Sequence, residues 1–220
     1  VWDHLQCNAE DVEVLAQNFA LTPIAARLLV LRGLNTIDSA AEFLSPSLDQ
    51  LHDPFRLTDL AIAVDRLLVA IDNGERIAVH GDYDVDGITS TVIVRRVLEL
   101  LGGRVVHFIP QRLRDGYGLQ VGAIDRLQSR GVSVIVAVDC GIRSREAALR
   151  AKKLGVDLII TDHHQPDSTL PPAFAVVNPR RSDCQYPEKD LAGVGVALKL
   201  VQGLCIKSKK PKLFSGFVKL

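Results

Sequence analysis

The chain has 220 residues, of which 47% are apolar and 24% charged, and its formal net charge is zero. A chain of this length and composition can bury a substantial core, as one large domain or as one domain with an appendage. It contains no apolar run near the roughly 18 residues of a membrane span and no secretory signal, so we expect a cytoplasmic location. The zero net charge excludes a polycation that binds nucleic acid over its whole surface.

The four cysteines are scattered along the chain and include no C-x-x-C pair: Cys7, Cys140, Cys184 and Cys205. Neither a thiolate metal site nor a disulfide framework fits this spacing. We therefore expect reduced thiols, with Cys140 as a small buried side chain.

The first quarter of the chain is predicted to be helical. The segments "TPIAARLLVLRGL" and "TIDSAAEFL" carry apolar residues at three- and four-residue spacing, with Thr22 and Thr36 as N-caps. The stretch "SPSLDQLHDPF" interrupts this pattern, and a further amphipathic helix runs from Thr58 to a C-capping Gly74. We therefore predict a helical N-terminal extension over residues 1–57.

From residue 58 onwards, short β-branched runs alternate with helical segments. The runs are "RIAVHGD", "RVVHFIP", "VSVIVAVD", "DLIITD" and "FAVVNP", and strand–helix repetition at this spacing is typical of a parallel sheet. The predicted fold class is α/β: a mostly parallel five-stranded sheet with helices on both faces, over residues 58–206. We assign residues 207–220, which break off in the middle of a pattern, to a truncated connection.

Acidic and imidazole side chains follow three of the predicted strands. They are Asp82, Asp84 and Asp86 after the first strand, Asp139 after the third, and Asp162, His163 and His164 after the fourth. In an open parallel sheet the ligand crevice lies at the carboxyl ends of the strands. We therefore expect all of these side chains along one edge of the sheet.

Each of these groups, taken alone, has a simpler explanation. An acidic run is often a surface turn or a calcium loop, and an aspartate after a strand often caps the next helix. The EF-hand explanation fails, because the acidic run lacks the downstream Glu and leads from a strand into a helix. Four or five acidic groups in one crevice would repel one another strongly, and bound divalent cations would remove that repulsion.

Ligand chemistry narrows the choice of metal. Aspartate oxygens with one or two imidazoles and no thiolate suit Mn²⁺ or Mg²⁺, and the number of ligands would serve two ions. Paired ions about 4 Å apart assist phosphoester hydrolysis by activating a water and stabilising the leaving oxygen. Adjacent side chains at a strand exit should diverge, so we expect one of His163 and His164 to face the metal and the other to face a substrate phosphate.

The motifs "HGDYDVDG", "VDCG" and "TDHH", in this order and spacing, resemble the first three motifs of the DHH phosphoesterase superfamily. "DGYGL" and "LAGVGVALKL" resemble its RecJ branch of single-stranded-DNA exonucleases, and the likeness extends into the helical lead-in. This resemblance implies a Mn²⁺- or Mg²⁺-dependent hydrolase that degrades single-stranded DNA from the 5′ end to 5′-mononucleotides, in recombination and repair. It further implies single-stranded DNA, single-strand-binding protein and a RecQ-type helicase as partners, and we expect a monomer and no membrane association.

By position, the resemblance implies the metal ligands Asp82, Asp84, Asp86, Asp139 and His163. His80 joins them because its spacing fits the HxxxDxD pattern of related pyrophosphatases. The implied catalytic set is His164 at the scissile phosphate, Asp162 orienting a neighbouring imidazole, and Arg112 gripping a phosphate. A solvated loop arginine is the alternative for Arg112, and we interpret the "GVG" of Gly193–Gly195 as helix packing rather than a phosphate cradle.

RecJ-like proteins continue into a fourth aspartate motif and further domains, whereas this sequence stops at "FSGFVKL". We therefore expect a fragment with reduced or no independent activity, and the absence of Met suggests a trimmed start. Two alternatives stay open: a DHH-type phosphodiesterase of short oligonucleotides or cyclic dinucleotides, and a non-catalytic RecJ-related replication scaffold. The retained aspartates argue against the scaffold, because an abandoned metal site has no reason to keep mutually repelling carboxylates.

Overall fold

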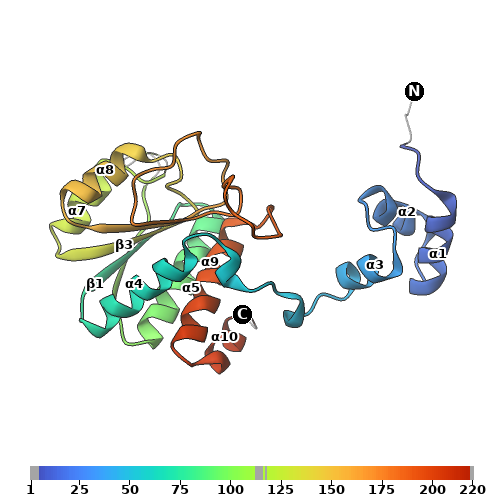
Figure 1. Cartoon of the computed structure of the whole chain (residues 1–220), viewed down its shortest axis with the longest axis horizontal. Helices are drawn as coiled ribbons and strands as arrows, with labels where there is room; N and C mark the ends of the chain where they lie inside the picture. Colours follow the sequence, from blue (N-terminus) through green and yellow to red (C-terminus); the bar gives the residue numbers. More distant parts are fainter. Residues whose placement is uncertain (1–4, 112–115, 117, 219–220) are drawn as a thin grey trace. The chain divides into compact units, whose positions relative to one another are not determined.

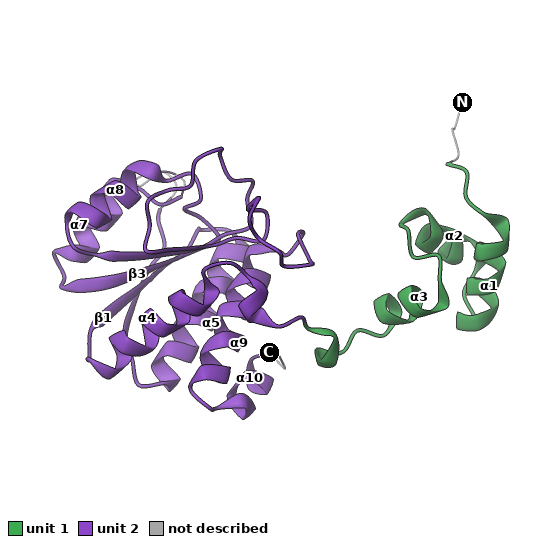
Figure 2. Cartoon of the chain, viewed as in Figure 1, with its two compact units in different colours: residues 1–51 green, residues 52–220 purple. Residues whose placement is uncertain are grey.

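The computed structural model describes residues 5–111, 116 and 118–218. Its contacts divide the chain into two compact units, Val1–Leu51 and His52–Leu220, which Figure 2 shows in green and purple. Each unit has a hydrophobic core of its own.

The first unit is a small helical module, as its sequence predicts. Its elements are helices α1 (Ala9–Phe19), α2 (Pro23–Leu31) and α3 (Ile37–Leu44), followed by the 3₁₀ turn η1 (Leu48–Gln50). The Thr22 and Thr36 side chains accept hydrogen bonds from the backbone N–H groups of Ala25 and Ser39, which confirms both expected N-caps. The buried residues of its core are Leu15, Ala26, Leu29 and Ala40.

The second unit contains a parallel β-sheet with five strands in the described residues, which confirms the predicted fold class. The strands are β1 (Arg76–His80), β2 (Arg104–Phe108), β3 (Val132–Val138), β4 (Asp157–Thr161) and β5 (Ala175–Val177). Their order is β2-β1-β3-β4-β5, and every neighbouring pair is parallel. The carboxyl ends of the strands therefore all lie along one edge of the sheet.

Helices cover both faces of this sheet (Figure 1). They are α4 (Leu60–Asp72), α5 (Val85–Leu100), α9 (Gly193–Lys207) and α10 (Pro211–Phe217) on one face, and α7 (Val121–Gln128) and α8 (Arg145–Lys153) on the other. Alternate residues of each strand point to opposite faces. In β3, Val134 and Val136 pack into the core beneath α4, α5 and α9, whereas Ile135 and Ala137 pack beneath α7 and α8.

The segments at both ends of the second unit pack against its core. Residues 52–57, which fall within the predicted extension, include the turn η2 (Pro54–Arg56) and the buried Leu57, which joins the core beneath α9. Residues 207–220 include α10, whose Phe217 is buried in the same core. Apolar side chains thus tie both segments to the sheet domain.

All four cysteines are free thiols, as expected. None of the described helices has both the length and the apolar character needed to cross a membrane.

Candidate metal centre

The predicted site residues that the structure describes lie at the carboxyl edge of β1, β3 and β4. His80 ends β1, Val138 ends β3 and Thr161 ends β4. The register aligns these ends, because Val138 lies opposite Thr161 and His80 lies opposite Ala137. The acidic side chains that follow each strand therefore emerge next to one another.

The turn between β1 and α5 holds two carboxylates by backbone hydrogen bonds. Asp82 is fully buried, and its Oδ1 accepts a hydrogen bond of 2.7 Å from the Tyr83 N–H. Asp84 is the N-cap of α5, and its Oδ1 accepts a hydrogen bond of 2.9 Å from the Gly87 N–H. Helix capping, the simpler explanation of such aspartates, therefore applies to Asp84. The cap uses only one carboxylate oxygen, so Asp84 can cap the helix and also bind a ligand through the other oxygen.

Gly87 makes this turn possible, since a Cβ there would lie 2.5 Å from the Asp82 backbone nitrogen and 2.6 Å from its oxygen. We expect Gly87→Ala to lower the free energy of unfolding by about 1–3 kcal/mol, the usual cost of overpacking, although Ala favours helices over Gly by about 1 kcal/mol. Urea denaturation measures the change. Gly122→Ala is the control, because a Cβ there meets no described atom within 4 Å. Equal stability of the two variants would contradict the expectation.

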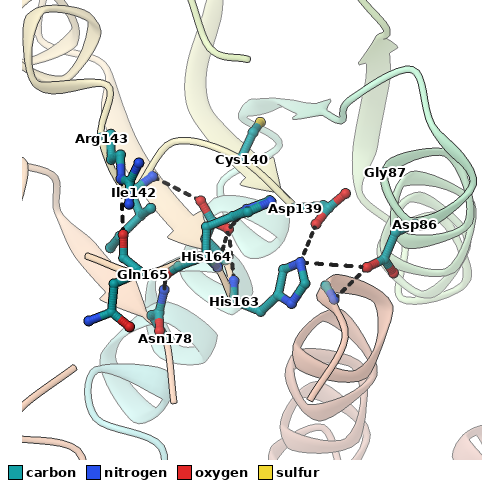
Figure 3. A network of polar contacts seen from close by, with 12 residues as sticks. Asp86, Gly87, Asp139, Cys140, Ile142, Arg143, His163, His164, Gln165 and Asn178 are labelled. Carbon is teal, nitrogen blue, oxygen red and sulfur yellow. Dashed lines mark hydrogen bonds and ion pairs between the residues drawn. The ribbon is translucent and has the colours of Figure 1, made fainter. Parts of the chain in front are cut away.

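Asp139 and His163 form the centre of the cluster (Figure 3). The Nε2 of His163 lies 3.3 Å from Asp139 Oδ1 and 3.8 Å from Asp86 Oδ2. Asp139 is buried in a left-handed backbone conformation with φ of 58°. Its Oδ1 has no hydrogen-bond partner among the described residues.

The environment of Asp139 opposes its negative charge. Burial, followed by repulsion from Asp86, Asp84 and Asp162, raises the pKa of Asp139 to about 8. In the absence of a cation this carboxyl group therefore holds a proton at neutral pH. A bound cation would remove both causes of the shift, because it neutralises the carboxylates and supplies the missing partner.

Asp162 and His164 form a second pair beside the first. The buried Asp162 accepts hydrogen bonds from His164 Nδ1 at 2.7 Å and from the backbone N–H groups of His163, His164 and Ile142. Burial opposes ionisation of Asp162, but the bonds from His164 and Ile142 outweigh it and lower the pKa of Asp162. The same bond to Asp162 raises the pKa of His164 above its usual value of 6.5.

The two imidazoles thus face different carboxylates, His163 towards Asp139 and His164 towards Asp162. They do not point in opposite directions, because their ring centroids lie 4.5 Å apart with the planes tilted by 57°. Potential ligand atoms of Asp139, His163 and His164 all lie within 4.8 Å of one another. This set of oxygen and imidazole donors without thiolate fits Mn²⁺ or Mg²⁺.

His80, the remaining predicted ligand, ends β1 at the same edge of the sheet. It is fully buried, its ring stacks on Phe108, and its Nδ1 lies 3.7 Å from the Cys140 sulfur. Burial raises the pKa of the Cys140 thiol, which fits the small buried side chain expected there. Arg112 lies outside the described residues.

Two features of the site are not predicted from the sequence. Asn178, directly after β5, is buried, and its Nδ2 donates a hydrogen bond of 2.9 Å to the His164 carbonyl oxygen. Its position after the strand "FAVV" is the signal that indicates it. The backbone N–H groups of Gly193 and Val194 donate hydrogen bonds to the Asp86 carboxylate. No side-chain pattern in the sequence indicates this contact, because the donors are backbone groups.

The fold and the site define a class of protein: a parallel α/β domain with a cluster of carboxylates and imidazoles, suited to divalent cations, at the carboxyl edge of its sheet. The model of the DHH family, N-terminal domain, matches residues 76–217. The chain belongs to the DHH family.

Curated relatives of the chain are RecJ proteins, which confirms the resemblance. The chain is 42% identical over 203 residues to the single-stranded-DNA-specific exonuclease RecJ of Bacillus subtilis, covering 92% of this chain and 26% of that protein. It is 40% identical over 185 residues to RecJ of Escherichia coli, covering 84% of this chain and 31% of that protein. The chain thus spans between a quarter and a third of the length of these relatives.

Two solved structures extend the comparison. A crystal structure of the exonuclease RecJ bound to manganese matches with a TM-score of 0.66 and 37% identity, over 73% of this chain and 41% of that one. RecJ of Thermus thermophilus in complex with Mn²⁺ matches with a TM-score of 0.73 and 31% identity, over 96% of this chain and 29% of that one.

Proposed function

We propose that this chain is the N-terminal catalytic domain of a RecJ-type exonuclease, which hydrolyses phosphodiester bonds of single-stranded DNA from the 5′ end and releases 5′-mononucleotides in recombination and repair. The observation that supports this most strongly is the meeting of Asp86, Asp139 and His163 at the carboxyl edge of the sheet, with Nε2–oxygen distances of 3.8 and 3.3 Å. The names of the relatives point to the same substrate.

Mn²⁺ or Mg²⁺ is the proposed cofactor, bound as a pair of ions. The two buried carboxylate oxygens without a described hydrogen-bond partner, Asp82 Oδ2 and Asp139 Oδ1, support this choice, since buried polar atoms are seldom left unsatisfied. The proposed ligand set is Asp82, Asp84, Asp86, Asp139, His163 and His80. When bound, the ions supply Lewis-acid stabilisation of the charge that develops on the scissile phosphate and a lowered pKa for the attacking water.

His164 is the proposed contact to the scissile phosphate. Its Nδ1 donates to the buried Asp162, which fixes the ring and leaves Nε2 as the second donor of the imidazolium. The raised pKa of His164 favours this charged form, which suits an anionic substrate. Asp162 is then a positioning residue that acts through His164, and Arg112 remains a proposed second contact to phosphate.

Digestion of labelled oligonucleotides tests this proposal. With Mn²⁺ and single-stranded DNA labelled at either end, we expect slow release of mononucleotides from the 5′ end only, as for a fragment with reduced activity, and no digestion of a duplex. Asp84→Asn should reduce the rate by more than about 100-fold, because losing a ligand exceeds the 10- to 100-fold cost of losing a partner of a ligand. Asn caps a helix as well as Asp does, so this variant keeps the fold of the turn.

Asp72→Asn is the matched control, since Asp72 is an exposed carboxylate near the end of α4. Release from the 3′ end, digestion of the duplex, or full activity of Asp84→Asn would each contradict the proposal. Addition of single-strand-binding protein or a RecQ-type helicase tests the proposed partners, and sedimentation tests the proposed monomer.

A further inference from the structure

Helix α9 begins without a cap of its own. Its N-cap residue is Ala192, whose methyl side chain cannot accept a hydrogen bond, and Ala is among the poorest N-caps. The first N–H groups of a helix have no partner within the helix and need one from elsewhere. The start of α9 is also largely buried, because Gly193 and Val196 lie in the interior. An outside acceptor is therefore required.

Asp86 provides that acceptor from another helix. Its Oδ2 accepts a hydrogen bond of 2.7 Å from the Gly193 N–H, and its Oδ1 accepts one of 2.6 Å from the Val194 N–H. Figure 3 shows Asp86 between His163 and a backbone nitrogen of the adjoining helix. A carboxylate held at both oxygens by two fixed donors cannot rotate freely, and the positive end of the helix dipole stabilises its charge.

Gly193 also touches the opposite carboxylate. A Cβ at this position would lie 2.2 Å from Asp139 Oδ1, 2.6 Å from its Cγ and 2.9 Å from its Cβ. The Asp139 Cβ is fixed by the backbone, so rotation of the side chain cannot relieve the collision. One glycine thus donates to Asp86 and leaves room for Asp139.

We propose that the N-terminus of α9 is the element that positions the metal-binding carboxylates, with Gly193 as a positioning residue that sets Asp86 beside Asp139. The two N–H groups stabilise a negative charge that the neighbouring carboxylates disfavour, and they hold the Asp86 carboxylate with its Oδ2 3.8 Å from His163 Nε2. This inference rests on the proposed function only for the identity of the metal. It assigns to "GVG" a role that neither helix packing nor a phosphate cradle describes.

The test compares Gly193→Ala with Gly122→Ala. Both glycines lie in the first turn of a helix, and only Gly193 lacks room for a Cβ. We expect Gly193→Ala to weaken Mn²⁺ binding, measured by calorimetry, by about 10- to 100-fold, the usual effect of losing a partner of a metal ligand. Gly122→Ala should bind Mn²⁺ as the wild type does. Wild-type affinity of Gly193→Ala would overturn the proposal.

Thermal unfolding in EDTA separates positioning from a loss of fold. A Gly193→Ala protein that unfolds cooperatively near the wild-type temperature and yet binds Mn²⁺ weakly supports the proposal. Helix propensity alone would raise the unfolding temperature of Gly193→Ala, because Ala is favoured over Gly in a helix by about 1 kcal/mol.

A second measurement needs neither the metal nor a variant at Gly193. In amide NMR spectra of the metal-free protein, the N–H protons of Gly193 and Val194 should resonate at low field and move upfield in Asp86→Asn, with Asp72→Asn as the control. Unchanged resonances would overturn the proposal. If the wild type bound no Mn²⁺, the proposed function would fail, and these resonances would still decide whether α9 holds Asp86.

Discussion

Asp139→Asn is expected to make the metal-free protein more stable and to abolish its binding of Mn²⁺. The buried Asp139 carboxyl has a pKa raised to about 8 by burial and by its acidic neighbours. A neutral amide of the same shape avoids this penalty, and Asn tolerates the positive φ of 58° found here. We expect the free energy of unfolding to increase by about 1–3 kcal/mol at pH 8. This is a fraction of what the shift of the Asp139 pKa allows, because each pKa unit corresponds to about 1.4 kcal/mol.

The pH dependence identifies the cause of this gain. Between the ordinary pKa of 3.8 and the folded value of about 8, the folded protein holds a proton that the unfolded chain releases. The stability of the metal-free wild type therefore falls as the pH rises through this window, and the fall ends above the folded pKa. The Asn variant lacks this contribution, so its advantage should grow from acid to alkaline pH.

Urea unfolding in EDTA at several pH values measures this difference, and calorimetry with Mn²⁺ measures the loss of binding. His164 also loses stabilisation as the pH rises through its raised pKa, and the charge of Asp139 is one cause of that raised pKa. This loss is therefore smaller in the Asn variant, and it adds to the difference between the two proteins with the same sign. A variant that is less stable than the wild type at pH 8, or one that keeps its affinity for Mn²⁺, would contradict the expectation.

Asp162→Asn should have the second largest effect, with losses of both stability and activity. The Asp162 Oδ1 accepts three hydrogen bonds, and its Oδ2 accepts one of 2.9 Å from the Ile142 N–H. An Asn keeps one acceptor but presents an amide N–H₂ to another donor. The donor left without a partner costs about 1–3 kcal/mol, and the proposed nuclease rate should fall by about 10- to 100-fold.

The protonation of His164 distinguishes this cause from general damage. The hydrogen bond and the charge of Asp162 raise the pKa of His164, so removal of that charge should lower it. The rate of the variant should then decline at a lower pH than the rate of the wild type. NMR titration of the His164 ring in the metal-free protein measures the shift directly.

Asp167→Asn is the matched control, because Asp167 is an exposed carboxylate in the same loop whose only described contact is a 3.6 Å ion pair with Arg143. Its stability and rate should equal those of the wild type. An unchanged His164 pKa in Asp162→Asn would contradict the mechanism by which Asp162 is proposed to act.

The sheet and the edge that carries the site could be predicted because both depend on local patterns. The β-branched runs give the strands, the parallel connections bring their carboxyl ends to one edge, and the aspartates follow directly. Asp84 fits both the capping and the metal-site explanations, since it caps α5 and its charge is one of those that raise the pKa of Asp139.

The contact between Asp86 and the start of α9 could not be predicted, for a physical reason. The two are 107 residues apart, and the donors are backbone N–H groups, which every residue except proline has. Only the three-dimensional path of the chain selects Gly193 and Val194. The sequence pattern assigns residues 52–57 to the N-terminal extension, whereas the structure places them in the second unit. The reason is similar, because the burial of Leu57 beneath α9 depends on tertiary packing.

The bond between Asp86 and α9 also sets the order in which the protein can mature. A ribosome makes Asp86 more than a hundred residues before Gly193, and domains form from the N-terminus as the chain emerges. A nascent chain that ends before Val194 has the acidic run but not the two N–H groups that orient it. The acidic run therefore cannot take its final orientation before α9 has been synthesised, and a product that terminates before Val194 lacks the contact that holds Asp86.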